Sequence, residues 1–260
     1  MQDIEEMKRL SRERMAQTAE ALREKLKSIR HKVAVYSAKG GVGKTTVAVN
    51  LAVALADKGY AVGFLDADID CPNSQLFFGI KEKTKIVNGL LQPVKKHDVL
   101  VVSMSMLTDK DDEAIMWRGP MLTKAINDLL FLTDWGELDY LIIDLPPGTS
   151  DAPLTILQML DLDGFIAVTT PQQVAVNDMR RAVNMIRNMG TSVLGLVDNM
   201  CGDVFGCTKN EAAKIMGTRF LAHIPMDAAV SQAGDDGVPV VLKSPRMMEK
   251  FNAIVNAITQ

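Results

Sequence analysis

The stretch that decides the fold is Val33-Ala34-Val35-Tyr36-Ser37-Ala38 followed directly by Lys39-Gly40-Gly41-Val42-Gly43-Lys44-Thr45-Thr46. The first six residues predict a buried strand, the glycine-rich part a turn, and residues 44–58 a helix. Glycines let backbone N–H groups turn inward around phosphate oxygens, and the helix N-terminus adds its positive end. The sequence therefore predicts a phosphate-binding loop here.

Each position of this loop has an expected task. The strict pattern G-x-x-x-x-G-K-[ST] fails at its first position, where Ala38 stands, so the prediction depends on the strand-loop-helix context. Lys44 is expected to reach the β- and γ-phosphates and Thr45 to coordinate Mg²⁺. The remaining phosphate contacts are expected from Gly40, Gly41, Val42, Gly43 and Thr46. A glycine-rich turn without a ligand is the alternative.

The rest of the chain alternates strands with helices. Apolar runs predict further strands at 61–66, 98–104, 139–145, 164–170 and 192–198, and helical patterns lie at 119–132, 173–189 and 244–258. Their near-continuous Val, Ile and Leu content is typical of a parallel sheet covered on both faces. We therefore expect an α/β fold with a doubly wound, mostly parallel sheet. Residues 79–97 and 105–118 are predicted to be loop-rich.

Two further strand ends carry carboxylates. Asp66 and Asp68 follow the strand at 61–66, and Asp144 ends the apolar run Tyr140-Leu141-Ile142-Ile143. Carboxylates at the carboxyl edge of a parallel sheet point into the ligand crevice. Asp144 is expected to take part in binding Mg²⁺. Asp66 or Asp68 could instead cap the following helix.

Gly148 follows Asp144 in the segment Leu145-Pro146-Pro147-Gly148. The two prolines stiffen this backbone, and the glycine leaves room for its N–H to meet a γ-phosphate. A loop whose conformation depends on that contact is a nucleotide switch.

Composition narrows the class of protein. The chain has 260 residues, a net charge of −3, three cysteines and 47% hydrophobic residues. These values exclude a disordered chain and argue against nucleic-acid coating. No apolar run is long enough to span a membrane, no secretory signal is visible, and few cysteines fit a reducing compartment, so we expect a cytoplasmic location.

The N-terminal residues 1–31 are expected to form a helical extension ahead of an ATPase domain over residues 32–260. A narrow apolar stripe predicts that this helix packs on the body or on a partner. The stripe consists of Met15, Ala19, Leu22, Leu26 and Ile29.

The additional lysine in the loop, Lys39, resembles that of the deviant Walker A ATPases, which include ParA and MinD. Three further segments narrow the resemblance: Trp117-Arg118-Gly119-Pro120-Met121, residues 134–151 and residues 171–185. Together they resemble the Mrp/ApbC (Nbp35-like) branch of the SIMIBI-type P-loop NTPases over residues 30–258. Members of that branch are ATPases that carry or assemble iron–sulfur clusters.

The resemblance implies roles for individual residues. Lys39 would reach across a homodimer interface to the partner's ATP, where its charge would offset that developing on the phosphates. Asp68 would orient the attacking water, and Asp66 would lie close to the Mg²⁺ shell. Asn199 would recognise the base, with Pro225 in the segment that closes over it. The implied catalytic set is thus Lys39, Lys44 and Asp68, and the implied Mg²⁺ set is Thr45, Asp66 and Asp144.

The cysteines depart from that family's pattern. Its carriers have a C-P-x-C pair, two of which supply four thiolates for a bridging [4Fe–4S] cluster. This chain has Cys201 and Cys207, separated by five residues, and no C-x-x-C. Two cysteines per chain still give four per dimer, so cluster binding is possible by count, with core or loop cysteines as the alternative. Cys71 and the three histidines, which show no metal-binding spacing, are expected to be structural.

Three functions remain open from the sequence. The first is a homodimeric, slowly hydrolysing ATPase that carries an iron–sulfur cluster to client apoproteins or a scaffold. The second is a MinD- or ParA-like positioning switch. The tail after Lys250 lacks the basic residues of a membrane helix, and the net charge of −3 argues against nucleic acid as a partner. The third keeps the ATPase without the cluster.

Overall fold

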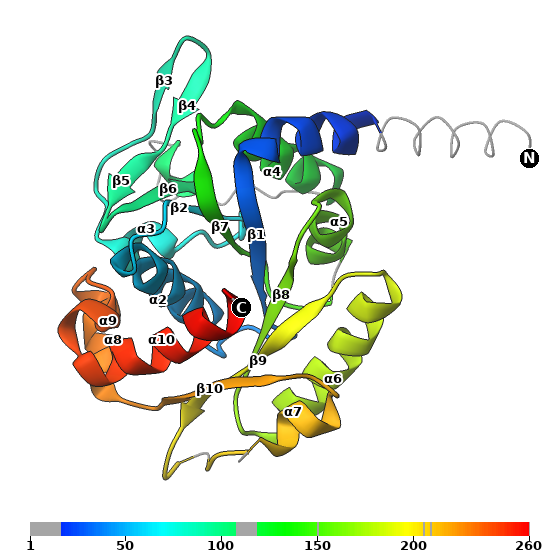
Figure 1. Cartoon of the computed structure of the whole chain (residues 1–260), viewed down its shortest axis with the longest axis vertical. Helices are drawn as coiled ribbons and strands as arrows, with labels where there is room; N and C mark the ends of the chain where they lie inside the picture. The colour runs from blue at the N-terminus through cyan, green and yellow to red at the C-terminus, as the bar shows by residue number, and fades with distance from the viewer. Residues whose placement is uncertain (1–16, 108–118, 150, 205, 209, 260) are drawn as a thin grey trace, which may run out of the picture.

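One eight-stranded sheet organises the chain, in the order β10-β9-β8-β1-β7-β2-β6-β5 (Figure 1). Every pair of neighbours is parallel except β5 and β6. The computed structural model describes residues 17–107, 119–149, 151–204, 206–208 and 210–259. The sheet strands are β1 (Ile29–Tyr36), β2 (Val62–Asp66), β5 (Val94–Lys96), β6 (Val99–Ser103), β7 (Leu138–Asp144), β8 (Gly164–Thr169), β9 (Val193–Cys201) and β10 (Phe220–Pro225). The predicted α/β class with a mostly parallel sheet is confirmed.

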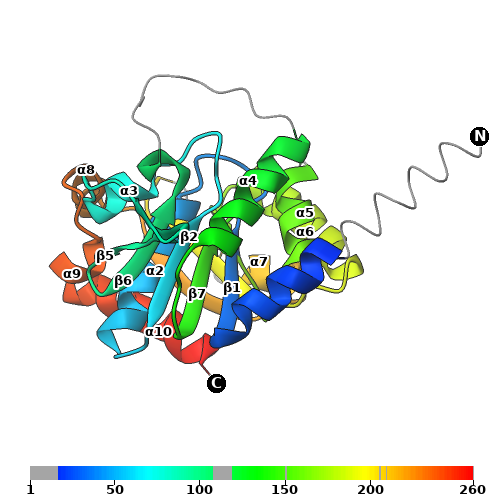
Figure 2. The same ribbon diagram turned by 90° about the horizontal axis from the view of Figure 1, so that it is seen from above.

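Helices cover both faces of the sheet (Figures 1 and 2). One face carries the helix over 17–25 together with α4 (Gly119–Leu132), α5 (Asp151–Met159), α6 (Gln173–Asn188) and α7 (Glu211–Ile215). The other carries α2 (Lys44–Asp57), α3 (Ser74–Phe78), α8 (Ala228–Asp235), α9 (Val240–Lys243) and α10 (Pro245–Ile258). This doubly wound arrangement explains the apolar strands, because both sides of each central strand are buried.

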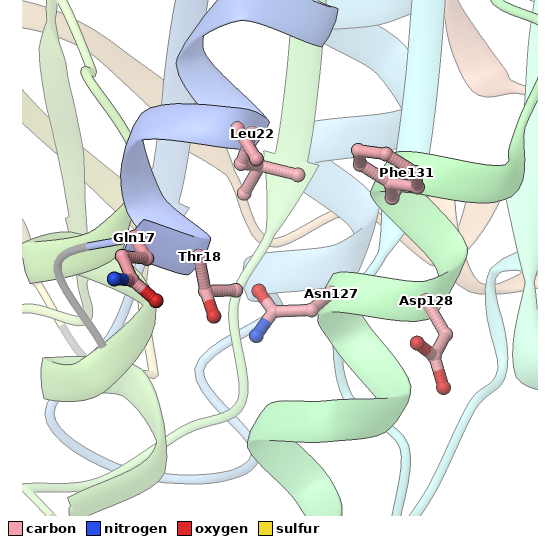
Figure 3. A pocket seen from close by; sticks show the side chains of 7 residues that line it. Gln17, Thr18, Leu22, Asn127, Asp128 and Phe131 are labelled. Carbon is pink, nitrogen blue, oxygen red and sulfur yellow. The ribbon is translucent and has the colours of Figure 1, made fainter. Parts of the chain in front are cut away.

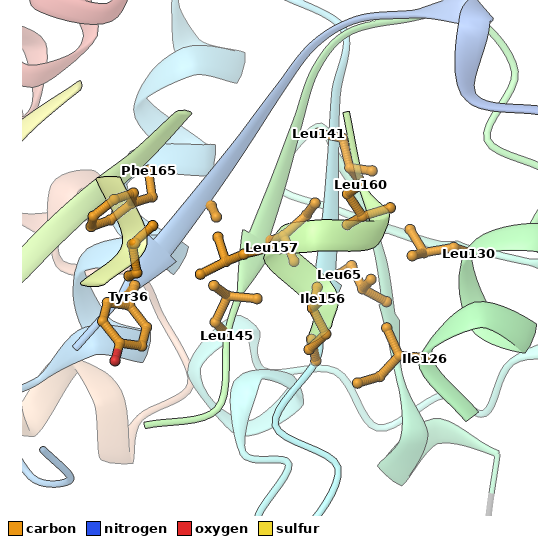
Figure 4. Packing of buried hydrophobic residues seen from close by; sticks show 14 of the residues in the cluster. Tyr36, Leu65, Ile126, Leu130, Leu141, Leu145, Ile156, Leu157, Leu160 and Phe165 are labelled. Atoms are coloured by element: carbon orange, nitrogen blue, oxygen red, sulfur yellow. The ribbon is translucent and has the colours of Figure 1, made fainter. Parts of the chain in front are cut away.

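Each face has its own hydrophobic core. Figure 4 shows part of the first, where Leu65 and Leu141 of the sheet meet Ile126 and Leu130 of α4 and Ile156 of α5. All five side chains are nearly or fully buried. Full burial of such a side chain contributes about 1.5–3 kcal/mol to the free energy of unfolding. The two helix layers therefore hold the strands, and with them the strand ends, in place.

The N-terminal helix packs on the sheet. Residues 17–25 are helical, a short 3₁₀ turn follows at Leu26–Ser28, and β1 begins at Ile29, earlier than the predicted strand. Leu22 and Leu26 are buried in the first core, as the apolar stripe predicts. The proposed boundary after residue 31 lies inside β1. Ile29 is also buried, and Ala19 is half-buried. The stripe residue Met15 and the motif residues Trp117 and Arg118 lie outside the described residues.

The region 79–97, expected to be loop-rich, holds three short strands. They are β3 (Lys85–Val87) and β4 (Leu90–Gln92), which pair in an antiparallel hairpin, and β5. Asn88 and Gly89 join the hairpin with φ of 52° and 79°. Two consecutive positive φ angles are the mark of a type I′ turn, which explains the Asn-Gly pair.

The C-terminal helix α10 is part of the second core. Met247, Phe251 and Ile254 are at most 1% exposed, so its apolar face is already covered by protein. In the described part of the chain, no helix is both long and apolar enough to cross a membrane.

Candidate functional site

The predicted nucleotide site lies where β1, β7 and β2 run side by side. Val35 and Asp66 both pair in register with Asp144, one from each side. The chain leaves β1 through α2 on one face and leaves β7 through α5 on the other, so the crossovers diverge at this point. In doubly wound sheets such a divergence opens a ligand crevice at the carboxyl ends of the strands.

The glycine-rich loop adopts a backbone that only glycine accepts easily. Gly41 and Gly43 have φ of 77° and 80°. A Cβ at Gly40 or Gly41 would meet nothing within 4 Å, so this side of the loop faces open space in which phosphates can be cradled. A Cβ at Gly43 would instead lie 2.2 Å from Asn199 Nδ2. Gly43 is therefore required by both its conformation and its neighbour.

Lys44, Thr45 and Asp144 converge behind the loop. Lys44 Nζ donates to Asp144 Oδ1 at 2.6 Å, and Thr45 Oγ1 donates to Asp144 Oδ2 at 2.6 Å. Lys44 is 6% exposed and Asp144 is fully buried. The three predicted residues are thus brought together with the charges and oxygens that a Mg²⁺–phosphate group requires.

Asp66 is the second buried carboxylate of the site. It accepts hydrogen bonds from the backbone N–H groups of Asp68 and Ser74, both at 3.1 Å. Burial, and then the neighbouring charge of Asp144, raise the pKa of Asp66 to about 7. Two adjacent carboxylates with one lysine between them suit a divalent cation, which would restore the missing positive charge.

Asp68, the predicted water-orienting residue, is half-buried beside the same cluster. Burial raises the pKa of Asp68, while the charge of Lys44 opposes that shift. Its backbone N–H donates to Asp66. Asp66 also accepts from Ser74, the first residue of α3, so this carboxylate binds the helix N-terminus as the alternative expected, whereas Asn73 at the cap position makes no side-chain cap bond.

Lys39 is held by its own chain. Its Nζ lies 2.8 Å from Asp178 Oδ2 on α6, and Arg181 lies 3.5 Å from the other oxygen of that carboxylate. Lys39 is 41% exposed, so the pair is accessible to solvent. The predicted reach across a dimer requires Lys39 to leave Asp178.

Gly148 is hydrogen-bonded to the two residues that precede the phosphate loop, Tyr36 and Ser37. Its N–H donates to the Ser37 carbonyl at 3.0 Å, and its own carbonyl accepts from Tyr36 Oη at 2.8 Å. Burial raises the pKa of Tyr36 to about 12, so the phenol stays a donor. The predicted contact of Gly148 with a γ-phosphate requires release of the Ser37 carbonyl.

Asn199 touches the phosphate loop directly. Its Nδ2 donates to the Val42 carbonyl at 2.8 Å, and the side chain is 5% exposed. If Asn199 contacts the base, it must therefore also brace the loop. Pro225 pairs with Cys201 across β9 and β10, and Asp227, two residues later, caps α8 through Ala229 N.

Cys201 and Cys207 form a second group of chemistry-bearing residues. Two backbone hydrogen bonds join Gly202 and Gly206 as the paired ends of a hairpin. The two sulfur atoms and a ring nitrogen of His223 all lie within 4.8 Å of one another. The five-residue spacing therefore brings the thiols together, whereas Cys71 is exposed elsewhere.

Cys201 is 4% exposed. Burial, and then the hydrogen bond with Cys207, raise the pKa of the Cys201 thiol well above its usual range. A thiol in this state is a poor nucleophile. A metal ion that binds it must displace the proton.

A separate hollow of about 320 Å³ lies between the helix over 17–25 and α4 (Figure 3). Gln17, Thr18 and Leu22 line one side, and Asn127 and Phe131 line the other. It shares no residue with the phosphate loop or the cysteine group.

Sequence reasoning missed three residues that the structure brings into these sites: Asp178, Asp198 and His223. His223 has no neighbouring ligand in sequence, and only the pairing of β9 with β10 brings it beside Cys201. Asp178 lies within the segment 171–185 that carried the resemblance, but no spacing rule links it to Lys39.

Fold and site together define a P-loop NTPase of the deviant Walker A class. The family model of the NUBPL iron-transfer P-loop NTPases, within ParA, matches residues 28–259. An iron–sulfur cluster carrier protein of Aquifex aeolicus is 41% identical over 253 residues, covering 92% of this chain and 70% of its own. One of Methanocaldococcus jannaschii is 40% identical, covering 95% and 90%. A nucleotide-binding protein of Archaeoglobus fulgidus in complex with ADP superposes with a TM-score of 0.73 at 35% identity, covering 85% and 92%.

The chain belongs to the NUBPL iron-transfer P-loop NTPase family. The predicted Mrp/Nbp35-like membership is confirmed, and the protein is an ATPase of that family.

Proposed function

We propose that this protein is an ATP-dependent iron–sulfur cluster carrier that works as a homodimer in the cytoplasm. The observation that carries the proposal is the hairpin that holds Cys201 Sγ and Cys207 Sγ within 4.8 Å at the end of β9. Thiolates are the ligands that iron–sulfur clusters require, and two protomers would supply four. Relatives that share the fold and about 40% of the sequence bear the name of cluster carriers.

The nucleotide part of the cycle uses the loop residues. Gly40, Gly41, Val42, Gly43 and Thr46 would hold the phosphates of ATP, and Lys44 would neutralise them. Mg²⁺ would be held by Thr45 and Asp144, with Asp66 nearby, and would stabilise charge on the phosphates when bound. Asp68 would orient the attacking water, and Asn199 and Pro225 would face the base.

The dimer part of the cycle uses Lys39 and Gly148. A second ammonium from the partner would stabilise the charge that develops between the β- and γ-phosphates. Release of Lys39 from Asp178 and of Gly148 from Ser37 are then the two rearrangements that ATP must drive. Turnover should be slow, well below the ~1–100 s⁻¹ of kinases, because none of the residues assigned to the site is an arginine finger.

The experiment that tests cluster carriage is anaerobic reconstitution with iron and sulfide. About four irons per dimer are expected in the wild type and none in the Cys201→Ala/Cys207→Ala variant, while Cys71→Ala serves as the matched control. Transfer to an apo-ferredoxin-type client would complete the test. Absence of specific iron in the wild type would contradict cluster carriage and leave a nucleotide switch.

Dimer-dependent turnover is tested with Lys39→Ala. We expect the rate per chain to rise with protein concentration in the wild type and to stay low and flat in the variant. Equal turnover in the two proteins would contradict the role of Lys39 across the interface.

A further inference from the structure

The cysteine group contains a third ligand-type residue that the family pattern did not predict. His223 on β10 places its Nδ1 3.4 Å from Cys201 Sγ. Strand pairing explains the approach, because His223 is in register with Asp198 and Pro225 with Cys201. Two sulfurs and one imidazole nitrogen of a single chain therefore face one another within 4.8 Å.

These separations suit a single metal ion. Around a tetrahedral ion with about 2.3 Å to sulfur and about 2.0–2.1 Å to nitrogen, neighbouring ligand atoms lie about 3.5–3.8 Å apart. The Cys201–His223 distance of 3.4 Å is close to that range, and small rotations of the exposed Cys207 would complete the set. Thiolate with imidazole is a ligand set typical of Zn²⁺, and soft thiolates also suit Fe²⁺ and Co²⁺.

The buried carboxylate of Asp198 independently indicates a cation at this position. It is fully buried, and its Oδ2 lies 3.4 Å from His223 Nδ1 while accepting from the backbone N–H and the hydroxyl of Thr208. Its Oδ1 is buried and has no hydrogen-bond partner among the described residues. A buried carboxylate with an unsatisfied oxygen is costly, and a cation next to it would offset that cost.

We propose that each protomer by itself binds one divalent transition-metal ion through Cys201, Cys207 and His223, with the buried Asp198 carboxylate as the neighbouring counter-charge. The ion is of the Zn²⁺ or Fe²⁺ type and differs from a cluster shared between two protomers. Three protein ligands leave the fourth position of a tetrahedral site open. An incoming thiolate of a receiving protein can bind there before the other ligands release, which suits hand-over. This inference deepens the proposed function, because it uses the same two cysteines.

The site is tested with Co²⁺ as a spectroscopic probe on the metal-free full-length chain. We expect one Co²⁺ per chain, with the intense visible bands of tetrahedral geometry and a thiolate charge-transfer band. His223→Ala should weaken binding by about 10- to 100-fold or more, since loss of even an outer partner has that effect. His223→Cys should restore a tetrahedral spectrum, because it returns a ligand.

The matched control is His31→Ala. His31 also lies beside an aspartate, with Nδ1 3.2 Å from Asp163 Oδ1, but it is near the start of β1 and has no cysteine partner. Its removal should leave Co²⁺ affinity and spectrum unchanged. Circular dichroism checks that each variant is folded. If His223→Ala does not fold, the altered charge-transfer bands of His223→Cys decide the question.

Two outcomes would overturn the single-chain site: wild-type affinity and spectrum in folded His223→Ala, or one Co²⁺ per two chains. Iron reconstitution of the same variants separates this inference from the proposed function. Four irons per dimer with no effect of His223 on Co²⁺ would leave cluster carriage intact and reject the site. Co²⁺ binding that depends on His223, without any cluster in the wild type, would support the single-chain site and reject cluster carriage.

Discussion

The nucleotide site and the cysteine site are built in different ways. The nucleotide site uses eight consecutive loop residues and carboxylates that end two neighbouring strands. The cysteine site uses a hairpin after β9 and a histidine on β10, joined only by strand register. The geometry of a site made of consecutive residues is determined by the local sequence, whereas the geometry of a site assembled across strands depends on the whole sheet. The independence of the two sites is tested by variants that should change one site and leave the other unchanged.

The largest effect is expected from Lys44→Ala. Loss of its charge from the phosphates should lower ATP hydrolysis by about 10²–10³-fold, as for other groups that stabilise a transition state. Asp144 would also be left buried without its partner, which destabilises by about 3–5 kcal/mol. Steady-state hydrolysis and thermal unfolding measure the two effects, with the exposed Lys58→Ala as control. Loss of reconstituted iron in folded Lys44→Ala would contradict the separation of the two sites.

Asp66→Asn should stabilise the nucleotide- and magnesium-free protein. Because the pKa of Asp66 is raised from 3.8 to about 7, the native state holds this proton while the unfolded state releases it. Its contribution to the free energy of unfolding therefore falls as pH rises through that interval, by on the order of 4 kcal/mol. Asparagine cannot ionise, so the melting temperature should gain more at pH 8 than at pH 5. Equal gains at both pH values would show that Asp66 does not titrate there.

Asn199→Ala tests the hydrogen bond that joins β9 to the phosphate loop. It removes the bond to the Val42 carbonyl and leaves that buried acceptor unpaired, so a loss of about 1–3 kcal/mol is expected. Affinity for ATP should fall with it, while iron per dimer stays constant. Calorimetric titration and thermal unfolding measure these changes against the exposed control Asn256→Ala. Unchanged ATP affinity would show that the loop holds its shape without this brace.

The smallest effect is expected from Asp178→Asn, which frees Lys39. An exposed ion pair is worth at most about 1 kcal/mol, so ATP-dependent dimerisation should tighten by no more than about fivefold for each of the two pairs released per dimer. Sedimentation velocity with a non-hydrolysable ATP analogue provides the measurement. Weaker dimerisation would show that Asp178 supports the dimer rather than competing for Lys39.

The sequence predicted those parts of the fold and site that depend on residues close together in the chain. Lys44, Thr45 and Asp144 meet as expected, because a loop between a strand and a helix fixes its own backbone and parallel strands end at one edge. The hairpin at Asn88 and Gly89 also has a local signal, the Asn-Gly pair, although its strands are too short to form long apolar runs.

His223 and Asp178 could not be predicted in this way. The place of His223 depends on a register shift between β9 and β10, next to Pro225. The contact of Asp178 with Lys39 depends on how α6 packs over the sheet, which no spacing in the sequence records. The same holds for Cys201 and Cys207, whose spacing alone did not reveal the paired glycines that bring the thiols together.

The end of β9 constrains how this chain can change in length. Asp198 contacts His223, while the next residue, Asn199, contacts Val42 on the loop, because successive side chains of a strand point to opposite sides. One inserted or deleted residue in β9 would exchange the two sides and disrupt both sites at once. The hairpin between Gly202 and Gly206 lies beyond that point and is bounded by the cysteines. It is therefore the segment where the spacing of the cysteines can vary between relatives without disturbing the phosphate loop.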